Sequence, residues 1–338
     1  MGLKRNTFYL KENCSPTYFN LSLYLKELGW KKSSWRSLAK FSSDNLAFNE
    51  AAAQCLEYKH LLADLVNQNC PRVMPVTYGI NDHNWPIILN QIAQKFYLRN
   101  NQLLNEVDNL IWILKPALLN NGQSIKLFNK LSDLEQHFLS TNRLGGEHVL
   151  QYYIPNPQLL RDQRKYSIRQ FMVLTNYAGA YLYPHGYFNV AMQPYTPNDI
   201  VNLNAHLTNE HLHGNDPNVI QIPTDQFTFF PDLYSQIKVI LEEVILGLQR
   251  NYPNAFKLHK KPTFALFGVD FMVDDQNKVW LLEANHGPCF PSTDDHPLQQ
   301  HLYQPFWRAI VRNFVLPISN QELLHAIEAR DFTKLINR

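Results

Sequence analysis

The stretch that decides the fold is FALFGVDFMVDDQNKVWLLEANHGP, which covers residues 264–288. It consists of two apolar runs that flank the polar segment 275–278. Apolar runs of this length on either side of a short turn-forming segment predict an antiparallel β-hairpin. We expect a four-residue loop, which makes Asp274 the partner of Val279 at the turn end of the hairpin.

The same register brings polar side chains together. Asp270 falls directly opposite Glu283, and Asn285 is the next residue on the same face. Two carboxylates at this spacing repel each other and are costly to bury, whereas Mg²⁺ prefers oxygen ligands of this kind. The hairpin therefore predicts a metal site with Asp270, Glu283 and Asn285 as ligands. The alternative is a solvated face with ordinary surface acids; the apolar character of both strands, typical of strands covered on both faces, favours the metal site.

The hairpin and four further segments resemble motifs of one known family. Residues 266–285 resemble the nucleotide-metal hairpin of the tubulin-tyrosine ligase family, whose fold is ATP-grasp. The other segments follow the family's order: a strand with an ATP-phosphate lysine at 112–116, a hinge strand at 149–154, Arg-Lys-Tyr-Ser-Ile-Arg at 164–169 and His-Leu-Thr-Asn at 206–209. Each motif is short, but five in one order are a specific signal. With weaker similarity elsewhere, the resemblance spans nearly the whole chain.

The resemblance implies a fold and an activity. The fold is α/β (α+β) ATP-grasp, with two α/β subdomains gripping ATP behind a small N-terminal domain. We expect a basic, partner-binding N-terminal domain at residues 1–57, a central ATP-grasp domain at 58–163, and a C-terminal ATP-grasp domain with the Mg site at 164–338. The implied activity is ATP-dependent carboxylate–amine ligation, which adds a free amino acid to a protein acceptor through an acyl-phosphate, with ATP and Mg²⁺ as cofactors.

The resemblance also assigns roles to individual residues of this chain. The expected nucleotide-binding residues are Lys115, Gln151, Tyr153, Ile154, Lys165 and Asn209. The expected substrate-binding residues are Arg169, His206 and Thr208, and the expected catalytic residues are Arg169 and Glu283. Ordinary structural roles remain open for four of them: Lys115 as the end of a strand, Gln151 as a core amide, Lys165 or Arg169 in a salt bridge.

Several positions depart from the family pattern. The phosphate-covering loop keeps only Gly122, and Asn121 takes its basic position. Tyr152 replaces a lysine after the hinge glutamine, and Ser167 replaces an aspartate. Two arginines that handle substrate carboxylates in the family are absent from residues 183–189. These changes put tubulin as the acceptor in question. They also leave open an alternative function, a degenerate member that binds nucleotide or a protein partner without ligation.

Charge and composition exclude some classes of protein. The 338 residues carry 31 Lys plus Arg against 29 Asp plus Glu, a net charge of +2, which is unlike a general nucleic-acid binder. The first 40 residues carry eight of these basic residues and two acidic ones, so we expect this end to face an acidic partner, such as an acceptor with an acidic tail. The alternative is a solvated surface with extended lysines.

The cellular location is predicted from what the sequence lacks. No apolar run reaches the roughly 18 residues of a membrane span, and residues 1–14 do not have the pattern of a signal peptide. The four cysteines, which form no CxxC pair, predict free thiols in a reducing compartment. We therefore expect a cytoplasmic protein, either in its own cell or delivered by a bacterium into a host cytosol.

Hydrophobic periodicity predicts the main secondary structure. We expect amphipathic helices over 50–68 and 232–250 and a last core helix over 305–315. Besides the hairpin, we expect strands at 110–114, 148–154 and 166–174, and a further strand that begins near residue 180.

Overall fold

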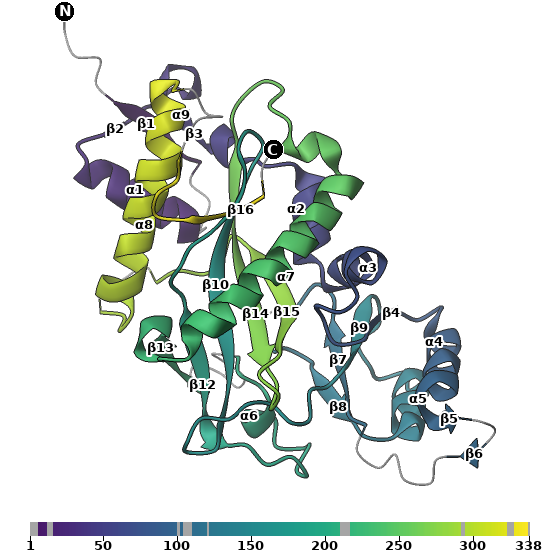
Figure 1. Ribbon diagram of the computed structural model, residues 1–338. Helices are drawn as coiled ribbons and strands as arrows, with labels where there is room; N and C mark the ends of the chain where they lie inside the picture. The colour runs from purple at the N-terminus through teal and green to yellow at the C-terminus, as the bar shows by residue number, and fades with distance from the viewer. Residues whose placement is uncertain are drawn as a thin grey trace, which may run out of the picture.

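A computed structural model describes residues 6–11, 16–99, 102–103, 110–119, 122–209, 217–291, 295–322 and 328–336. A seven-stranded antiparallel sheet forms its centre (Figure 1). The strands are β10 (Arg164–Thr175), β11 (Gly179–Leu182), β12 (Tyr187–Pro194), β13 (Val219–Pro223), β14 (Phe264–Val273), β15 (Val279–His286) and β16 (Thr333–Ile336). One edge of β10 pairs with β12 and then β11, and its other edge pairs with β14, which pairs with β15.

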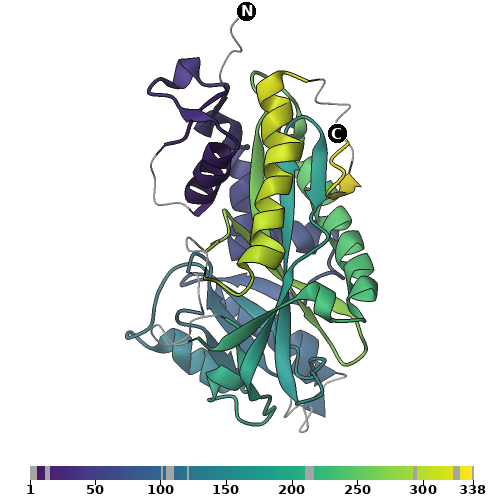
Figure 2. The same ribbon diagram turned by 90° about the vertical axis from the view of Figure 1, so that its left-hand side faces the viewer.

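The two faces of this sheet are covered by different helices. Side chains alternate along β10, so that Ile168 and Leu174 enter one apolar core while Phe171 and Val173 enter another. The first core is closed by α2 (Glu50–Glu57), α3 (Lys59–Asn69) and α7 (Phe230–Asn251). The second is closed by α1 (Pro16–Glu27), α8 (Gln304–Ile310) and η7 (Val311–Val315), which lie on the far side of the sheet from α7 (Figure 2).

The N-terminal part of the chain adds a small parallel sheet. Its strands are β1 (Thr7–Tyr9), β2 (Lys31–Lys32) and β3 (Phe41–Ser42), with β1 in the middle. Phe8 and Phe41 pack into the second core together with α1 and α8. This N-terminal part is therefore attached to the large sheet through a shared apolar core.

A four-stranded antiparallel sheet lies beside the large one (Figure 1). Its strands are β4 (Thr77–Ile80), β7 (Trp112–Pro116), β8 (Lys126–Phe128) and β9 (His148–Tyr152). The helices α4 (Trp85–Ile92) and α5 (Leu131–Leu139) cover it, and Trp112 and Leu150 are buried in the core between them. The mixed α/β character expected from the sequence is confirmed.

Shorter elements connect these layers. They are η1 (Arg36–Leu38), η2 (Ser43–Leu46), η3 (Ala93–Tyr97), β5 (Leu98–Arg99), β6 (Gln102–Leu103), α6 (Leu203–His206), η4 (Thr224–Gln226), η5 (Pro253–Phe256), η6 (Gln299–Tyr303) and α9 (Leu316–Asn320). None of the helices in the described ranges combines the length and the apolar character that a membrane crossing requires.

Most of the expected elements are present, with corrections. The helix expected over 232–250 is α7, and strands occur in each expected region. The single helix expected over 50–68 is wrong, because Tyr58 has an extended backbone and separates α2 from α3. The amide of Lys59 then bonds to the Ala117 carbonyl of the neighbouring loop, a tertiary contact that periodicity does not reveal. The expected last helix continues beyond Ile310 as a π-helical turn. The domain boundaries at 57/58 and 163/164 stay predictions.

The helix α7 offers a matched test of how this layer is held. Leu241 is 1% exposed and packs against the large sheet. Replacing it with Ala should lower the free energy of unfolding by about 2–5 kcal/mol, because a cavity remains. Replacing Val239, which is 52% exposed on the same helix, with Ala should change it by less than about 0.5 kcal/mol. Urea unfolding measures both, and equal losses would contradict this packing.

Candidate functional site

The residues predicted to form the site gather in one cleft between the two sheets. The cleft has a volume of about 230 Å³, and its walls come from β7 and β9 on one side and from β10, β12, β14 and β15 on the other. All twelve predicted site residues line it, namely Lys115, Gln151, Tyr153, Ile154, Lys165, Arg169, His206, Thr208, Asn209, Asp270, Glu283 and Asn285. Cys14, one of the four cysteines, lies outside the described residues, as do His211 and His213.

A β-bulge in the hairpin positions its acidic residues. At the turn end Val273 pairs with Val279, so the expected partnership of Asp274 with Val279 is wrong by one residue. Further along, the register shifts at Leu282, and Asp270 pairs with Glu283 as expected. The extra residue reverses the alternation of β15, so Glu283 faces the cleft instead of the core that holds Leu281.

The expected ligand set converges. The Asn285 amide nitrogen donates to Asp270 Oδ2 at 3.3 Å and to Glu283 Oε1 at 3.5 Å. From the next strand, Arg169 donates to both oxygens of Asp270, at 2.5 Å from Nε and 2.7 Å from Nη2. Arg169, Asp270 and Glu283 thus form one row across β10, β14 and β15.

The pKa values of the two carboxylates of this row are shifted in opposite directions. Burial, reinforced by Glu283, raises the pKa of Asp270, although the Arg169 guanidinium opposes it. Burial acts in the same direction on Glu283, but Lys59, Lys115 and Arg169 outweigh it and hold the pKa of Glu283 below its ordinary value. Glu283 is therefore anionic throughout the neutral range.

Lys59 is a residue of this site that the sequence analysis missed. Its Nζ lies 3.4 Å from Glu283 Oε2 and donates to the Leu119 carbonyl at 2.9 Å. Lys59 begins α3 directly after the break at Tyr58, and its ammonium contacts Glu283, which lines the cleft. A lysine within one amphipathic pattern carries no signal of this kind, so only the tertiary structure identifies it.

Lys115 and Gln151 form a hydrogen-bonded chain on the opposite wall. Lys115 Nζ donates to Gln151 Oε1 at 2.9 Å, and Gln151 Nε2 donates to Thr77 Oγ1 at 2.8 Å. Burial lowers the pKa of Lys115 to about 8, although Glu283 opposes the shift. The amide of Gln151 thus holds the Lys115 ammonium toward the cleft, and its expected contact with adenine stays a prediction.

A second buried lysine, Lys165, also lines the cleft. Lys165 Nζ donates to Tyr153 Oη at 2.6 Å and to the His206 carbonyl at 2.9 Å, and it lies 4.3 Å from the Tyr153 ring centre. Burial lowers the pKa of Lys165 to about 7, and Lys115 adds to this effect. The His206 ring contacts Tyr153 Oη and the Asp199 carbonyl, so His206 orients this cluster.

The comparisons with known proteins agree on one family. The model of the tubulin-tyrosine ligase family matches residues 82–323, and the chain belongs to that family. It is 25% identical over 291 residues to the probable tubulin–tyrosine ligase PBY1 of Saccharomyces cerevisiae, covering 70% of this chain and 38% of that protein. It is 25% identical over 222 residues to tubulin glycylase 3C of Tetrahymena thermophila, covering 59% and 20%.

A third relative has a related name. The chain is 27% identical over 213 residues to protein polyglycylase TTLL10 of Macaca fascicularis, covering 53% of this chain and 34% of that protein. The chain thus spans less than two fifths of the length of these relatives. Ligases of this family form amide bonds in a reaction that depends on ATP.

The two buried lysines predict that a polyphosphate binds together with protons. At pH 8 about half of Lys115 and most of Lys165 are neutral, given pKa values of about 8 and 7. Phosphate oxygens favour the ammonium forms and raise both pKa values, so binding takes up protons and weakens as the pH rises from 7 to 9. Calorimetry of ATP binding at pH 8, in two buffers with different ionisation enthalpies, measures the uptake.

The Lys115→Gln variant is the control for this experiment. It should bind ATP more weakly and take up fewer protons than the wild-type chain at the same pH. Binding that releases protons, or that tightens between pH 7 and pH 9, would contradict the assignment of these lysines.

Proposed function

We propose that the chain is an ATP-dependent carboxylate–amine ligase that adds an amino acid to a protein acceptor through an acyl-phosphate. The observation that carries the proposal is the row of Arg169, Asp270 and Glu283 facing Lys115 across a cleft between two sheets. Anionic phosphates need cations on several sides, and the ligase reaction also needs a metal site beside them. The cleft supplies both kinds of group.

The nucleotide is proposed to lie along the cleft. Lys115 and Lys59, which flank Glu283, would neutralise oxygens of the phosphate chain. Tyr153 and Ile154, with Gln151, would border adenine at the end of β9. Lys165 and Asn209 also line the cleft, where they would contact the nucleotide as well.

The residues present fit a magnesium ion. Asp270, Glu283 and Asn285 supply oxygens that converge within hydrogen-bonding distance of one amide, and Asn285 would present its Oδ1 after rotation of that amide. No cluster of three or more His, Cys, Asp or Glu occurs among the described residues, so the site depends on the amide oxygen together with phosphate oxygens. Mg²⁺ bound there would offset the charge that develops on the transferred phosphoryl group.

The proposed reaction has two steps. A carboxylate oxygen of the acceptor attacks the γ-phosphorus, the bond to the ADP oxygen breaks, and an acyl-phosphate forms. The amine nitrogen of the amino acid then attacks the acyl carbon, the C–N bond forms, and phosphate leaves with the C–O bond pair while the amine proton passes to solvent. Arg169 and Glu283, which face this region, are the proposed catalytic residues; Thr208 and His206 would orient substrate.

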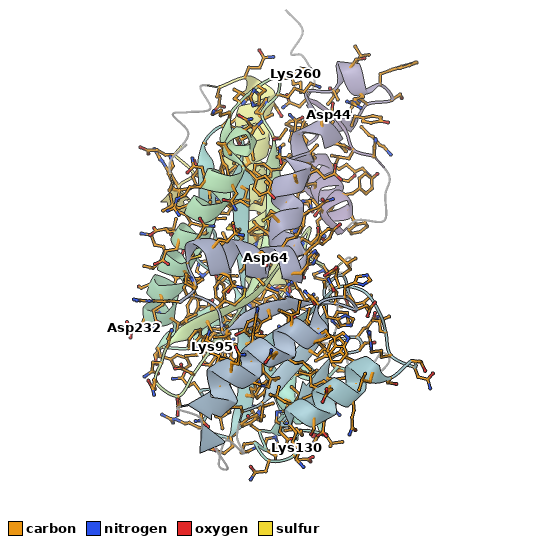
Figure 3. The ribbon with its side chains drawn as sticks, turned by 90° about the vertical axis from the view of Figure 1, so that its right-hand side faces the viewer. Asp44, Asp64, Lys95, Lys130, Asp232 and Lys260 are labelled. Atoms are coloured by element: carbon orange, nitrogen blue, oxygen red, sulfur yellow. The ribbon has the colours of Figure 1, made fainter. Side chains whose placement is uncertain are left out.

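The acceptor is proposed to be a protein with an acidic segment, and tubulin is one candidate. Lys31 and Lys32 are exposed on the N-terminal sheet. Asp44 of the same region is paired with Arg36 and Lys261, and Figure 3 shows Lys260 at this end of the molecule. A surface with this excess of cations attracts acidic chains in a salt-dependent way. We also propose a cytoplasmic location, where ATP and Mg²⁺ are abundant.

The charge of Glu283 is the sharpest test of the proposed function. The Glu283→Gln variant should lose Mg²⁺-dependent ADP release by at least about 100-fold, because an amide cannot replace an anionic ligand next to phosphate. At 100 times its dissociation constant, Mg-ATP should stabilise the wild-type chain by about 2.7 kcal/mol, and thermal unfolding should show a smaller shift for the variant.

The matched control is Asp275→Asn in the exposed turn of the same hairpin. It makes the same chemical change outside the cleft and should keep both ADP release and the thermal shift. Full turnover by the Glu283→Gln variant would contradict the assignment of the site.

One observation favours a second candidate, a nucleotide-binding protein without ligase activity. Leu118 and Leu119, exposed apolar residues, follow β7 where phosphates would be covered, and the Leu119 carbonyl is held by Lys59. We expect amino-acid-dependent ADP release and a mass increase of an acceptor when the chain is incubated with ATP, amino acids and lysate protein. Binding of ATP with neither signal would favour the second candidate.

A further inference from the structure

A row of uncharged polar side chains lies next to the charged row of the cleft. Ser167 of β10 pairs with Asn189 of β12, which pairs with Gln221 of β13. All three line the cleft, and Ser167 and Asn189 are only 4% and 7% exposed. Ser167 is two residues before Arg169 on the same face of β10, so this row lies one step along the strand from the proposed reaction centre.

The hydrogen bonds of this row leave one acceptor open. Gln221 Nε2 donates to Asn189 Oδ1 at 3.3 Å, and Thr208 Oγ1 donates to Ser167 Oγ at 2.8 Å. Gln221 Oε1 is shielded from solvent and has no hydrogen-bond donor within the described part of the chain. A shielded amide oxygen is costly to leave without a donor, so it favours a ligand that brings an N–H group.

The cations of the cleft are engaged elsewhere. Among the described residues, the lysines and arginines that line it are Lys115, Lys165 and Arg169. Lys115 bonds to Gln151, Lys165 to Tyr153 and the His206 carbonyl, and Arg169 to Asp270. A side-chain carboxylate placed over Asn189 and Gln221 would therefore be desolvated without a lysine or arginine of the row as its counter-charge.

The anions of the cleft are also distant from this row in the sheet. Three acidic residues of the described ranges line the cleft: Asp270 and Glu283 belong to β14 and β15, on the opposite side of β10 from β12 and β13, and Glu57 belongs to α2. A cationic side chain over Asn189 and Gln221 would thus have no carboxylate partner in the row. An uncharged side chain loses the least solvation free energy when it binds over this row.

We infer that Ser167, Asn189 and Gln221 bind the amine donor and select an amino acid with an uncharged side chain. This inference rests on the proposed function. Of the two groups that react, the amino group of the donor can donate an N–H to Gln221 Oε1, whereas the reacting carboxylate of the acceptor would be repelled by the same oxygen. Gln221 and Asn189 are therefore the specificity-determining residues for the donor.

The test measures incorporation of amino acids by the full chain with ATP, Mg²⁺ and lysate protein as the acceptor. The donors are glycine, alanine, serine and tyrosine; glutamate and aspartate; and lysine and arginine. We expect incorporation of at least one uncharged donor at a kcat/KM at least about 10-fold above that of every charged donor. A preference of the wild-type chain for a charged donor overturns the inference.

Two variants locate the selection. Gln221→Leu removes the open acceptor and should raise KM for the uncharged donor by about 10-fold without changing the ATP dissociation constant. Asn189→Asp, which keeps the side-chain size, should raise the relative use of lysine or arginine. The control is Gln193→Leu, which lies outside the cleft on β12, the strand of Asn189. It should behave as wild type.

The outcomes separate the inference from the proposed function. A Gln221→Leu variant that changes ATP affinity and not the KM of the donor assigns the row to the nucleotide and overturns the inference while the ligase proposal stands. Wild-type chain that binds ATP but incorporates no amino acid overturns the ligase proposal and the inference with it. The ATP-dependent thermal shift of each variant shows that it is folded.

Discussion

The bulge at Leu282 decides which face of the sheet Glu283 occupies, and the cleft depends on that choice. Without the extra residue, strict alternation would put the Glu283 carboxylate into the apolar core beside Leu281, where an unpaired charge is very costly. With it, Glu283 lies beside Asp270 and Asn285, at the point where the hairpin meets the four-stranded sheet. One backbone irregularity thus lets two apolar strands present a cluster of side-chain oxygen atoms to the cleft.

The charges of the cleft come from separate parts of the fold. Lys59 comes from the start of α3, Lys115 from the four-stranded sheet, and Arg169 and Asp270 from the large sheet. Each lysine or arginine lies close enough to affect the protonation of Glu283. In the described ranges, no single helix or strand carries both the positive and the negative charges of the site. The electrostatic interactions of the site therefore depend on how the two sheets pack. This arrangement keeps the Glu283 carboxylate ionised.

Membership of the tubulin-tyrosine ligase family and the local chemistry of the cleft carry different information. The family assignment covers residues 82–323 and fixes the class of reaction to be considered. The side chains beyond Arg169 on β12 and β13, Asn189 and Gln221, line the cleft and are uncharged. In our proposal they bear on the choice of substrate rather than on the class of reaction.

The expected pairing of Asp270 with Glu283 holds only because the bulge compensates for a loop that is one residue longer than expected. The sequence by itself determined the hairpin and twelve of the residues that line the cleft, because apolar runs and ordered motifs are local properties of a chain. It did not determine the bulge, since strand-forming residues with one extra position look the same as a regular strand; the loop was consequently expected to be one residue shorter. It also gave no sign of Lys59, because the break at Tyr58 is set by a contact with the loop after β7. Only the tertiary structure brings such distant segments together, and burial among them sets the protonation of the lysines.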